Sequence, residues 1–235
     1  MQFTISSQHA KLSHARQLTT LQAYAESAVL NANRHPTTFL TCAIRPAGIF
    51  GEGDAQMIPK ILEAARRKQH RFQVGANTNL FDFTYVGNVA HAHLLAASAL
   101  LKTHAMLPTV PLDSERVDGE AFFVTNGSPV YFWDMARMIW KEAGEVMPPS
   151  DVWVLPQGLL QPLGAVLETA FWVLGKTPNL TRQAVRYSCM TRYYNINKAK
   201  RRLGYWPIVE LEEGIRRGVR AQLDREREQV DKKAQ

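Results

Sequence analysis

Tyr194 and Lys198 have the types and spacing for proton transfer, because a lysine one helical turn from a tyrosine can lower the pKa of its hydroxyl. That chemistry needs both side chains on one face of one helix. The residues after Tyr194 predict a short helix that begins near Asn197 and ends at the Gly204-Tyr-Trp-Pro207 stop. Tyr194 then precedes the helix, and we predict that this pair is not catalytic.

Histidines and cysteines offer a second kind of chemistry. His91 and His93 lie two residues apart, so on one helix their side chains point about 200° apart and cannot share a metal ion. We expect one to pack and the other to be exposed. Cys42 and Cys189 are the two cysteines of the chain, and neither lies in a Cys-x-x-Cys pair. We therefore predict no metal site and no disulfide framework, and a reducing compartment.

A glycine-rich loop, RPAGIFGEGD at residues 45–54, follows an apolar strand. Proline at position 46 removes an N–H group, and glycines at 48, 51 and 53 let the backbone turn tightly and approach a ligand. Ligands of open α/β sheets bind at the carboxyl ends of the strands. On spacing alone, a ligand-binding loop and a plain strand-to-helix connection remain equally open.

Alternating strands and helices position these residues. The pattern predicts an α/β fold with a largely parallel sheet, although only two central strands and up to three short ones are recognisable. The strand at 37–44 is apolar throughout, so it should be central and covered on both faces, but the strands that should pair with it on one side are absent, and we expect an exposed apolar edge. Helices are predicted over 19–33, 56–68, 86–101, 130–143, 198–203 and after Glu210, with further strands near 71–75 and 121–127.

Charge restricts the partners of the chain. Its formal net charge is +7, and the excess gathers near the C-terminus, where basic residues alternate with acidic ones as on a solvated helix face. No nucleic-acid motif accompanies it, which makes nucleic acid an unexpected partner and favours an anionic membrane surface. Residues 152–175 carry Trp153 and Trp172 near their ends and are interrupted by prolines. We expect this segment to lie along a membrane interface or to wall the core, and both remain open.

Three motifs occur in a characteristic order: TCAIRPAGIFGEGD at 41–54, NLFDFTYVGNVAHAHLLAA at 79–97 and INKAKRRLGYWPIVELEEGI at 196–215. Together they resemble the 3β-hydroxysteroid dehydrogenase family, whose nearest branch is the sterol-4α-carboxylate 3-dehydrogenases. The resemblance implies an incomplete doubly wound Rossmann-type parallel sheet with a mainly helical substrate-binding part. It implies an unmatched segment at 1–17, a remnant of the NAD-binding domain at 18–127 with a substrate loop near 45–80, and a substrate-binding part at 128–235.

The resemblance also implies site residues. Those expected beside NAD or NADP are Arg45, Pro46, Ala47 and Gly48, and those expected beside a sterol are Ile49, Phe50, Gln56 and Phe83. Asn88 is of a type that can cap a helix start, and we expect its role to be structural. Other enzymes of sterol C4-demethylation are implied as partners, and the cytosolic face of the endoplasmic reticulum or the cytoplasm as the location.

The catalytic machinery of the family is absent from this sequence. Leu18 and Gln22 stand where the tyrosine and lysine belong, and none of the fourteen glycines forms the fingerprint that seats a pyrophosphate. We expect no catalytic residue and no useful dinucleotide binding. Three interpretations follow: a truncated and inactive dehydrogenase, a non-catalytic descendant that binds sterol or a partner, and an unrelated α/β binding module.

Overall fold

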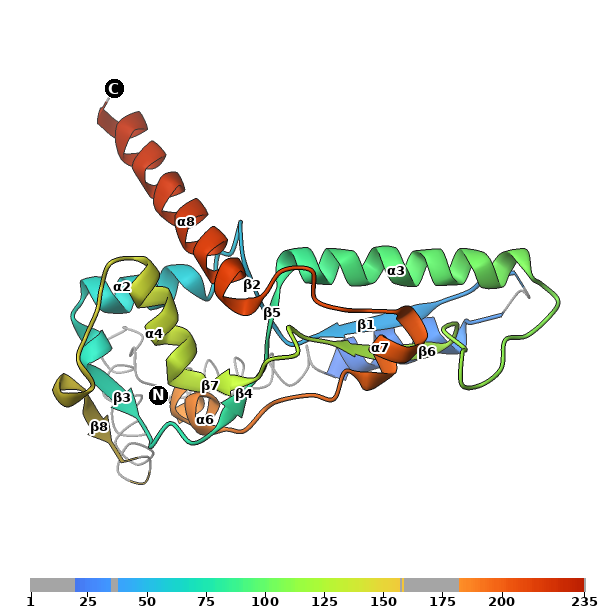
Figure 1. The fold of residues 1–235 in the computed structure, drawn as a ribbon, viewed down its shortest axis with the longest axis horizontal. Helices are drawn as coiled ribbons and strands as arrows, with labels where there is room; N and C mark the ends of the chain where they lie inside the picture. The colour runs from blue at the N-terminus through green and yellow to red at the C-terminus, as the bar shows by residue number, and fades with distance from the viewer. Residues whose placement is uncertain (1–19, 35–37, 157, 159–181, 235) are drawn as a thin grey trace, which may run out of the picture. The chain divides into compact units, whose positions relative to one another are not determined.

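The computed structural model describes residues 20–34, 38–156, 158 and 182–234 (Figure 1). Short strands alternate with helices, which agrees with the predicted α/β class. The strands are β1 (Cys42–Pro46), β2 (Gly48–Phe50), β3 (Phe72–Val74), β4 (Leu80–Phe81), β5 (Phe83–Tyr85), β6 (Glu120–Val124), β7 (Val130–Tyr131) and β8 (Trp153–Leu155). The helices are one over residues 20–31, α2 (Ile58–Arg66), η1 (Gln69–Arg71), α3 (Val86–Ala105), α4 (Phe132–Glu142), η2 (Pro149–Asp151), α6 (Arg182–Cys189), α7 (Asn197–Leu203) and α8 (Leu211–Ala234).

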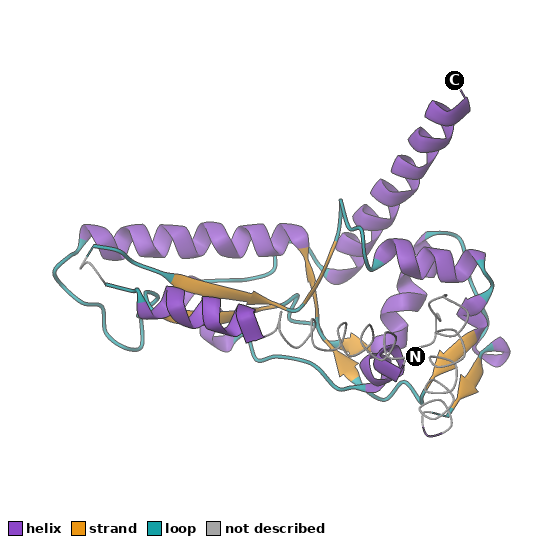
Figure 2. Ribbon diagram, turned by 180° about the vertical axis from the view of Figure 1, so that it is seen from behind, coloured by secondary structure: helices purple, strands orange, loops and turns teal. Residues whose placement is uncertain are grey.

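Within the described residues the strands form two-stranded pairs. β1 pairs with β6, β2 with β5, β3 with β8 and β4 with β7. The β2–β5 and β3–β8 pairs are parallel, and the β4–β7 pair is antiparallel. Figure 2 shows these strands in orange and the helices in purple. The parallel pairs agree with the prediction of a largely parallel arrangement.

The chain packs as two units, each built from separate stretches of sequence. Unit 1 comprises residues 1–45, 92–123 and 197–205, and unit 2 comprises 46–91, 124–196 and 206–235. Three of the five boundaries fall inside β1, α3 and β6. The predicted boundary near residue 127 separates a cofactor-binding part from a substrate-binding part. It concerns function rather than packing, and it stays a prediction.

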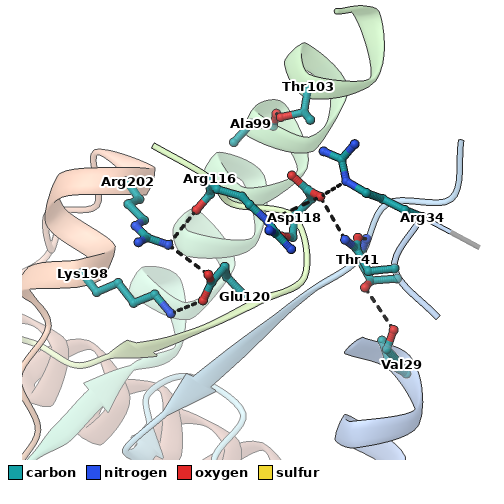
Figure 3. A network of polar contacts seen from close by, with 11 residues as sticks. Val29, Arg34, Thr41, Ala99, Thr103, Arg116, Asp118, Glu120, Lys198 and Arg202 are labelled. Atoms are coloured by element: carbon teal, nitrogen blue, oxygen red, sulfur yellow. Dashed lines mark hydrogen bonds and ion pairs between the residues drawn. The ribbon is translucent and has the colours of Figure 1, made fainter. Parts of the chain in front are cut away.

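Unit 1 is joined by a polar network around Asp118 (Figure 3). The Asp118 carboxylate is fully buried and accepts hydrogen bonds from Arg34 Nε at 2.7 Å and Asn33 Nδ2 at 2.9 Å. Nearby, the Glu120 carboxylate pairs with Lys198 at 2.5 Å and with Arg202 at 3.2 Å. These contacts connect the turn after the first helix, the start of β6 and α7.

Unit 2 is held by an apolar core. Its buried side chains come from β2, β4, β5, α2, α4 and the first half of α8: Phe50, Ile58, Leu62, Phe81, Phe83, Tyr85, Met135, Ile139, Leu211, Ile215 and Val219. Two α8 glycines allow the helix to approach closely. A Cβ on Gly218 would lie 3.1 Å from Gly51 Cα, and a Cβ on Gly214 would lie 2.9 Å from the Tyr85 ring. Bulk at either position would push α8 away from the glycine-rich loop.

The strand predicted at 37–44 begins later than expected. β1 spans Cys42–Pro46, its residues are half-buried or exposed, and β6 is its one partner strand among the described residues. The single described partner agrees with the expected loss of pairing on one side, whereas the strand is not covered on both faces. Thr41 is kept out of the strand pairing because its N–H donates to Asn33 Oδ1 at 2.8 Å and its carbonyl accepts from Gly119 N at 2.6 Å.

The predicted helices are confirmed with small shifts of their ends. The helix expected over 56–68 is α2, that over 86–101 is α3, and that over 130–143 is α4. None of the helices in the described part of the chain is long and apolar enough to cross a membrane. Of the segment 152–175, β8 and its neighbours up to Pro156 are described, whereas most of the segment, including Trp172, lies outside the described residues.

Candidate functional site

The predicted sterol-facing residues gather on the β2–β5 pair. Gly48 lies opposite Phe83, and Phe50 lies opposite Tyr85, with the Phe50 and Tyr85 ring centroids 6.0 Å apart. Phe50 and Phe83 are almost fully buried in the core, whereas Ile49 is 47% exposed. Of the predicted sterol-facing residues on these two strands, Ile49 is thus the one whose side chain is available to a ligand. Contact of Phe50 and Phe83 with a sterol stays a prediction.

Gln56 lies beyond this pair, at the start of α2. Its side chain is exposed, and its N–H donates to Asp54 Oδ1 at 2.7 Å. The same carboxylate accepts hydrogen bonds from the N–H groups of Met57 and Ile58, both at 3.0 Å. Asp54 therefore satisfies the free N–H groups at the beginning of α2, which fixes the end of the glycine-rich loop.

The predicted cofactor residues are already engaged. In unit 1, Arg45 makes two hydrogen bonds to the Glu26 carboxylate, one of them from Nε at 2.9 Å, and these hold the pKa of Glu26 below its usual range. In unit 2, the Ala47 N–H donates to Thr84 Oγ1 at 3.0 Å and to the Val124 carbonyl at 3.2 Å. Pro46 has no N–H to donate.

A dinucleotide does not fit the described residues by themselves. Arg45 Nε and Nη2 and the Ala47 N–H are engaged within the protein, and Gln22, at the expected lysine position, is an exposed residue of the helix over 20–31. The sequence also lacks the glycine fingerprint. Together these observations argue against a pyrophosphate site at Arg45 and Ala47, and the absence of dinucleotide binding stays a prediction.

Tyr194 and Lys198 do not lie on one helix. Tyr194 precedes α7, as expected; its N–H donates to Asp82 Oδ2 at 2.8 Å and its hydroxyl accepts from Arg192 Nε at 2.7 Å. Lys198 is paired with Glu120 in unit 1. Asp82 is buried, and that burial raises its pKa. The Asp82 carboxylate thus fixes the chain before α7. Tyr194 and Lys198 share no described helix.

A buried polar network that the sequence did not indicate lies next to the candidate loop. Asn88 Nδ2 donates to the Val209 carbonyl at 2.8 Å and to Asn126 Oδ1 at 3.1 Å, and its Oδ1 accepts from the N–H groups of Ile208 and Val209, both at 3.0 Å. Asn88 lies inside the first turn of α3 and is not a helix cap, although its type can cap a helix start. Its role remains architectural, because every polar atom of the side chain is used to join distant segments.

The prediction that one of the two histidines packs while the other is exposed agrees with the structure. His91 is half-buried and His93 is exposed, and no group of three metal-ligating side chains occurs in the described stretches. Cys42 and Cys189 are both free thiols. Burial raises the pKa of Cys42, which makes it a weaker nucleophile.

A cavity of about 410 Å³ lies in unit 2, and sequence reasoning missed it. Its lining includes Gly75, Ala76, Asn79, Val154 and Cys189. Asn79 Nδ2 donates to the carbonyls of Ser188 and Met190, both at 3.0 Å, which fixes α6 against this loop. Gly75 has φ +74°, and a Cβ there would lie 2.8 Å from Cys189 Sγ. The cavity is mainly apolar with a few polar groups, as is usual for small-molecule sites.

Solved structures share this fold. The crystal structure of gox2253 matches with a TM-score of 0.57 and 24% identity, covering 86% of this chain and 54% of its own. A UDP-glucose-4-epimerase from Stenotrophomonas maltophila with bound NAD matches with a TM-score of 0.56 and 14% identity, covering 87% and 54%. At these identities the likeness shows the fold alone, and it confirms the Rossmann-type prediction.

Curated relatives are more similar in sequence. A sterol-4-alpha-carboxylate 3-dehydrogenase, decarboxylating, of Saccharomyces cerevisiae is 46% identical over 194 residues, covering 83% of this chain and 53% of the relative. Its counterparts in Schizosaccharomyces pombe and Homo sapiens are 45% identical over 206 residues (88% and 56% covered) and 33% identical over 198 residues (83% and 50% covered). The chain spans about half the length of these relatives.

A sequence model described as the 3-beta hydroxysteroid dehydrogenase/isomerase family matches residues 5–157, and this match includes the glycine-rich loop, β5 and the start of α3. The interpretation as an unrelated α/β module is therefore wrong. The motifs, the fold and the family match agree, and the chain belongs to the 3-beta hydroxysteroid dehydrogenase/isomerase family.

Proposed function

We propose that this chain supplies the sterol-binding part of an NAD(P)-dependent 3β-hydroxysteroid dehydrogenase that oxidises the 3β-hydroxyl of a 4α-carboxysterol and releases the carboxylate. The observation that carries the proposal is the 46% identity to the decarboxylating dehydrogenase of Saccharomyces cerevisiae. The mainly apolar cavity and the half-exposed Ile49 support a sterol as the ligand. The proposed location is the cytosolic face of the endoplasmic reticulum or the cytoplasm.

The two halves of this reaction make different demands on a protein. Oxidation of C3 removes a hydride and the hydroxyl proton, and it needs an acceptor for each. Once C3 is a ketone, the C4–carboxylate bond can break, because its electron pair delocalises into the ketone as an enolate that then takes a proton at C4. We assign to the described residues neither the hydride acceptor nor the proton acceptor for the oxidation at C3. Their proposed task is to hold the sterol.

We therefore propose that this chain alone binds sterol and transfers no hydride. The exposed Gln22, in place of the lysine that would polarise the tyrosine, supports this division of roles. A non-catalytic protein that binds sterol or a partner is the second candidate, and the same observation favours it. The two candidates differ in whether an added cofactor-binding half restores turnover.

The first test measures sterol binding by equilibrium dialysis with a radiolabelled 4α-carboxysterol. Ala76→Phe fills the cavity and should weaken binding at least tenfold, whereas Ala97→Phe on the exposed side of α3 should not. If the two variants bound the sterol with equal affinity, the sterol would not bind in this cavity.

The second test has two steps. Isothermal titration calorimetry first measures the binding of NAD and NADP to the chain. The N-terminal half of a relative is then added together with cofactor and sterol. We expect no heat of binding from the chain alone and release of CO2 only from the mixture. Micromolar cofactor binding by the chain alone would contradict the proposed division. Stable assembly of the two halves without turnover would favour the non-catalytic candidate.

A further inference from the structure

Arg192 is a half-buried cation without an acidic partner in the described part of the chain. Its guanidinium lies over two aromatic rings, 5.9 Å from the Phe81 centroid and 5.8 Å from that of Tyr194. Its Nε donates to the Tyr194 hydroxyl at 2.7 Å, and this hydrogen bond, with the nearby Tyr187, raises the pKa of Arg192. Asp82, the nearest acid in the strand pairing, binds the Tyr194 N–H at 2.8 Å through Oδ2 and forms no ion pair with Arg192.

The backbone of Arg192 is held next to the lining of the cavity. Its N–H donates to the Leu80 carbonyl at 2.9 Å and its carbonyl accepts from the Asp82 N–H at 2.8 Å, so the residue pairs with β4 as a strand would. Figure 1 shows the chain that leaves α6 running beside β4. Leu80 directly follows Asn79, and Arg192 follows Cys189 by three residues; both Asn79 and Cys189 line the cavity. The cation therefore adjoins a mainly apolar ligand site.

The surround of this cation is aromatic and partly open to solvent. Phe81 is fully buried, whereas Tyr187, whose ring centroid lies 5.1 Å from that of Phe81, is 39% exposed. The terminal nitrogens of a guanidinium carry most of its N–H groups and can bind both oxygens of one carboxylate. Because a charge withdrawn from water is unfavourable without a counter-ion, an anionic ligand would complete this arrangement.

We propose that Arg192 binds the carboxylate of the substrate and makes this chain select a 4α-carboxysterol over the matching neutral sterol. The inference rests on the proposed function and assigns the residue that recognises the acid group. A carboxylate on an otherwise apolar molecule fits a single guanidinium among aromatic rings, because one cation balances one negative charge and the rings offer apolar contact. A phosphate group fits less well, since phosphate sites gather several cations or backbone N–H groups.

The test is equilibrium dialysis of the full chain with two radiolabelled ligands, a 4α-carboxysterol and the matching 4α-methyl sterol. Arg192→Met removes the charge and should weaken carboxysterol binding roughly tenfold to a hundredfold, while the affinity for the 4α-methyl sterol stays within about twofold. Unchanged binding of the neutral sterol also verifies that the variant is folded. Arg192→Lys should fall between the two, because an ammonium keeps the charge and loses the planar fork. The matched control is Arg186→Met, which removes the same charge from an exposed position on α6 and should alter neither affinity.

The outcomes separate this inference from the proposed function. If the wild type binds both sterols alike, or if Arg192→Met weakens both equally, the carboxylate assignment is wrong and sterol binding stands. If neither sterol binds, the proposed function fails, and a second readout still tests Arg192.

This second readout is the modification of Arg192 by phenylglyoxal, followed by peptide mass spectrometry. Cyclohexanecarboxylate should protect Arg192, and the neutral cyclohexanemethanol should not, because the alcohol has the same ring without the charge. Protection by the acid alone supports the carboxylate site even where no sterol binds. Equal protection by inorganic phosphate, or no protection by the acid, would overturn it.

Discussion

The forces that stabilise unit 1 differ from those that stabilise unit 2. Besides buried apolar side chains such as Phe122 and Tyr205, unit 1 contains carboxylates that are buried or half-buried and paired with arginine or lysine, at Asp118, Glu120 and Glu26. Unit 2 relies on an aromatic and aliphatic core and on neutral amides such as Asn88. Charge pairs give a unit sensitivity to pH and salt, whereas close apolar packing gives sensitivity to side-chain volume. The two units should therefore fail under different perturbations.

The largest effect is expected from Asp118→Ala in unit 1. The change leaves Arg34 and the Asn33 amide without their acceptor, and breaking a buried ion pair costs about 3–5 kcal/mol. Hydrogen exchange should accelerate in residues 38–41 and 116–123 and remain unchanged in the unit 2 core. Glu63→Ala, which breaks an exposed pair with Arg67, should cost under about 1 kcal/mol. A similar cost for both substitutions would remove the contrast between buried and exposed charge.

Gly218→Ala tests the dependence of unit 2 on volume. The new Cβ would lie 2.6 Å from Ile58 Cδ1 and 3.1 Å from Gly51 Cα, so we expect a loss of about 1–3 kcal/mol in urea denaturation. Adding Ile58→Val should recover only part of it, because the Gly51 backbone cannot withdraw. In an exposed helix the same change would stabilise by about 1 kcal/mol, and that result would contradict close packing here.

A smaller effect is expected from Thr84→Val beside the candidate loop. The Thr84 hydroxyl donates to the Val124 carbonyl and accepts from the Ala47 N–H, both at 3.0 Å. The substitution keeps the shape, and the Ala47 N–H retains its second acceptor, so we expect a loss of about 1 kcal/mol. Thr84→Ser keeps the hydroxyl and serves as the control. Chemical denaturation that ranks Ser below Val would show that the methyl group matters more than the hydrogen bonds.

The smallest effect is expected on moving from pH 7 to pH 4. Burial would raise the pKa of Asp118, but hydrogen bonds from Arg34 and Asn33 outweigh it and lower the pKa; pairing with Lys198 lowers that of Glu120. The stability that these groups give unit 1 is present above about pH 4.5 and is lost as the pH falls through their lowered values. Hydrogen exchange in unit 1 should therefore accelerate at pH 4, after correction for the intrinsic rate.

Asp82 in unit 2 should respond with the opposite sign. Burial raises its pKa, so protonation relieves a cost that is present at neutral pH. Glu213 and Glu226 on α8 have lowered pKa values, and the contrast should consequently be clearest in residues 80–85. Faster exchange there at pH 4, matching that of unit 1, would show that Asp82 is held as a favourable anion.

The features that depend on local sequence pattern could be predicted from the sequence. The helices followed from apolar spacing and from Gly and Pro stops, and three motifs placed the chain in its family. The short strands β2, β4, β5, β7 and β8 were not recognised, because two or three residues carry no period, and helix α6 was not predicted either. The partners of Asn88 could not be predicted, since those at 126 and 208–209 lie far along the chain. The cavity was missed for the same reason: Gly75, Val154 and Cys189 meet only after folding.

The hydrogen bonds of Asn88 also bear on the order of events at the ribosome. Its amide and that of Asn126 both donate to the Val209 carbonyl, so two buried asparagines wait for a residue made 121 and 83 positions later. At typical elongation rates of about 5–20 residues per second, Asn88 stays unsatisfied for roughly 6–24 s, and the exit tunnel adds to that delay. Unit 2 cannot close during this interval, because α8 completes its core after residue 209. Chaperone occupancy on the nascent chain should accordingly persist until α8 has emerged.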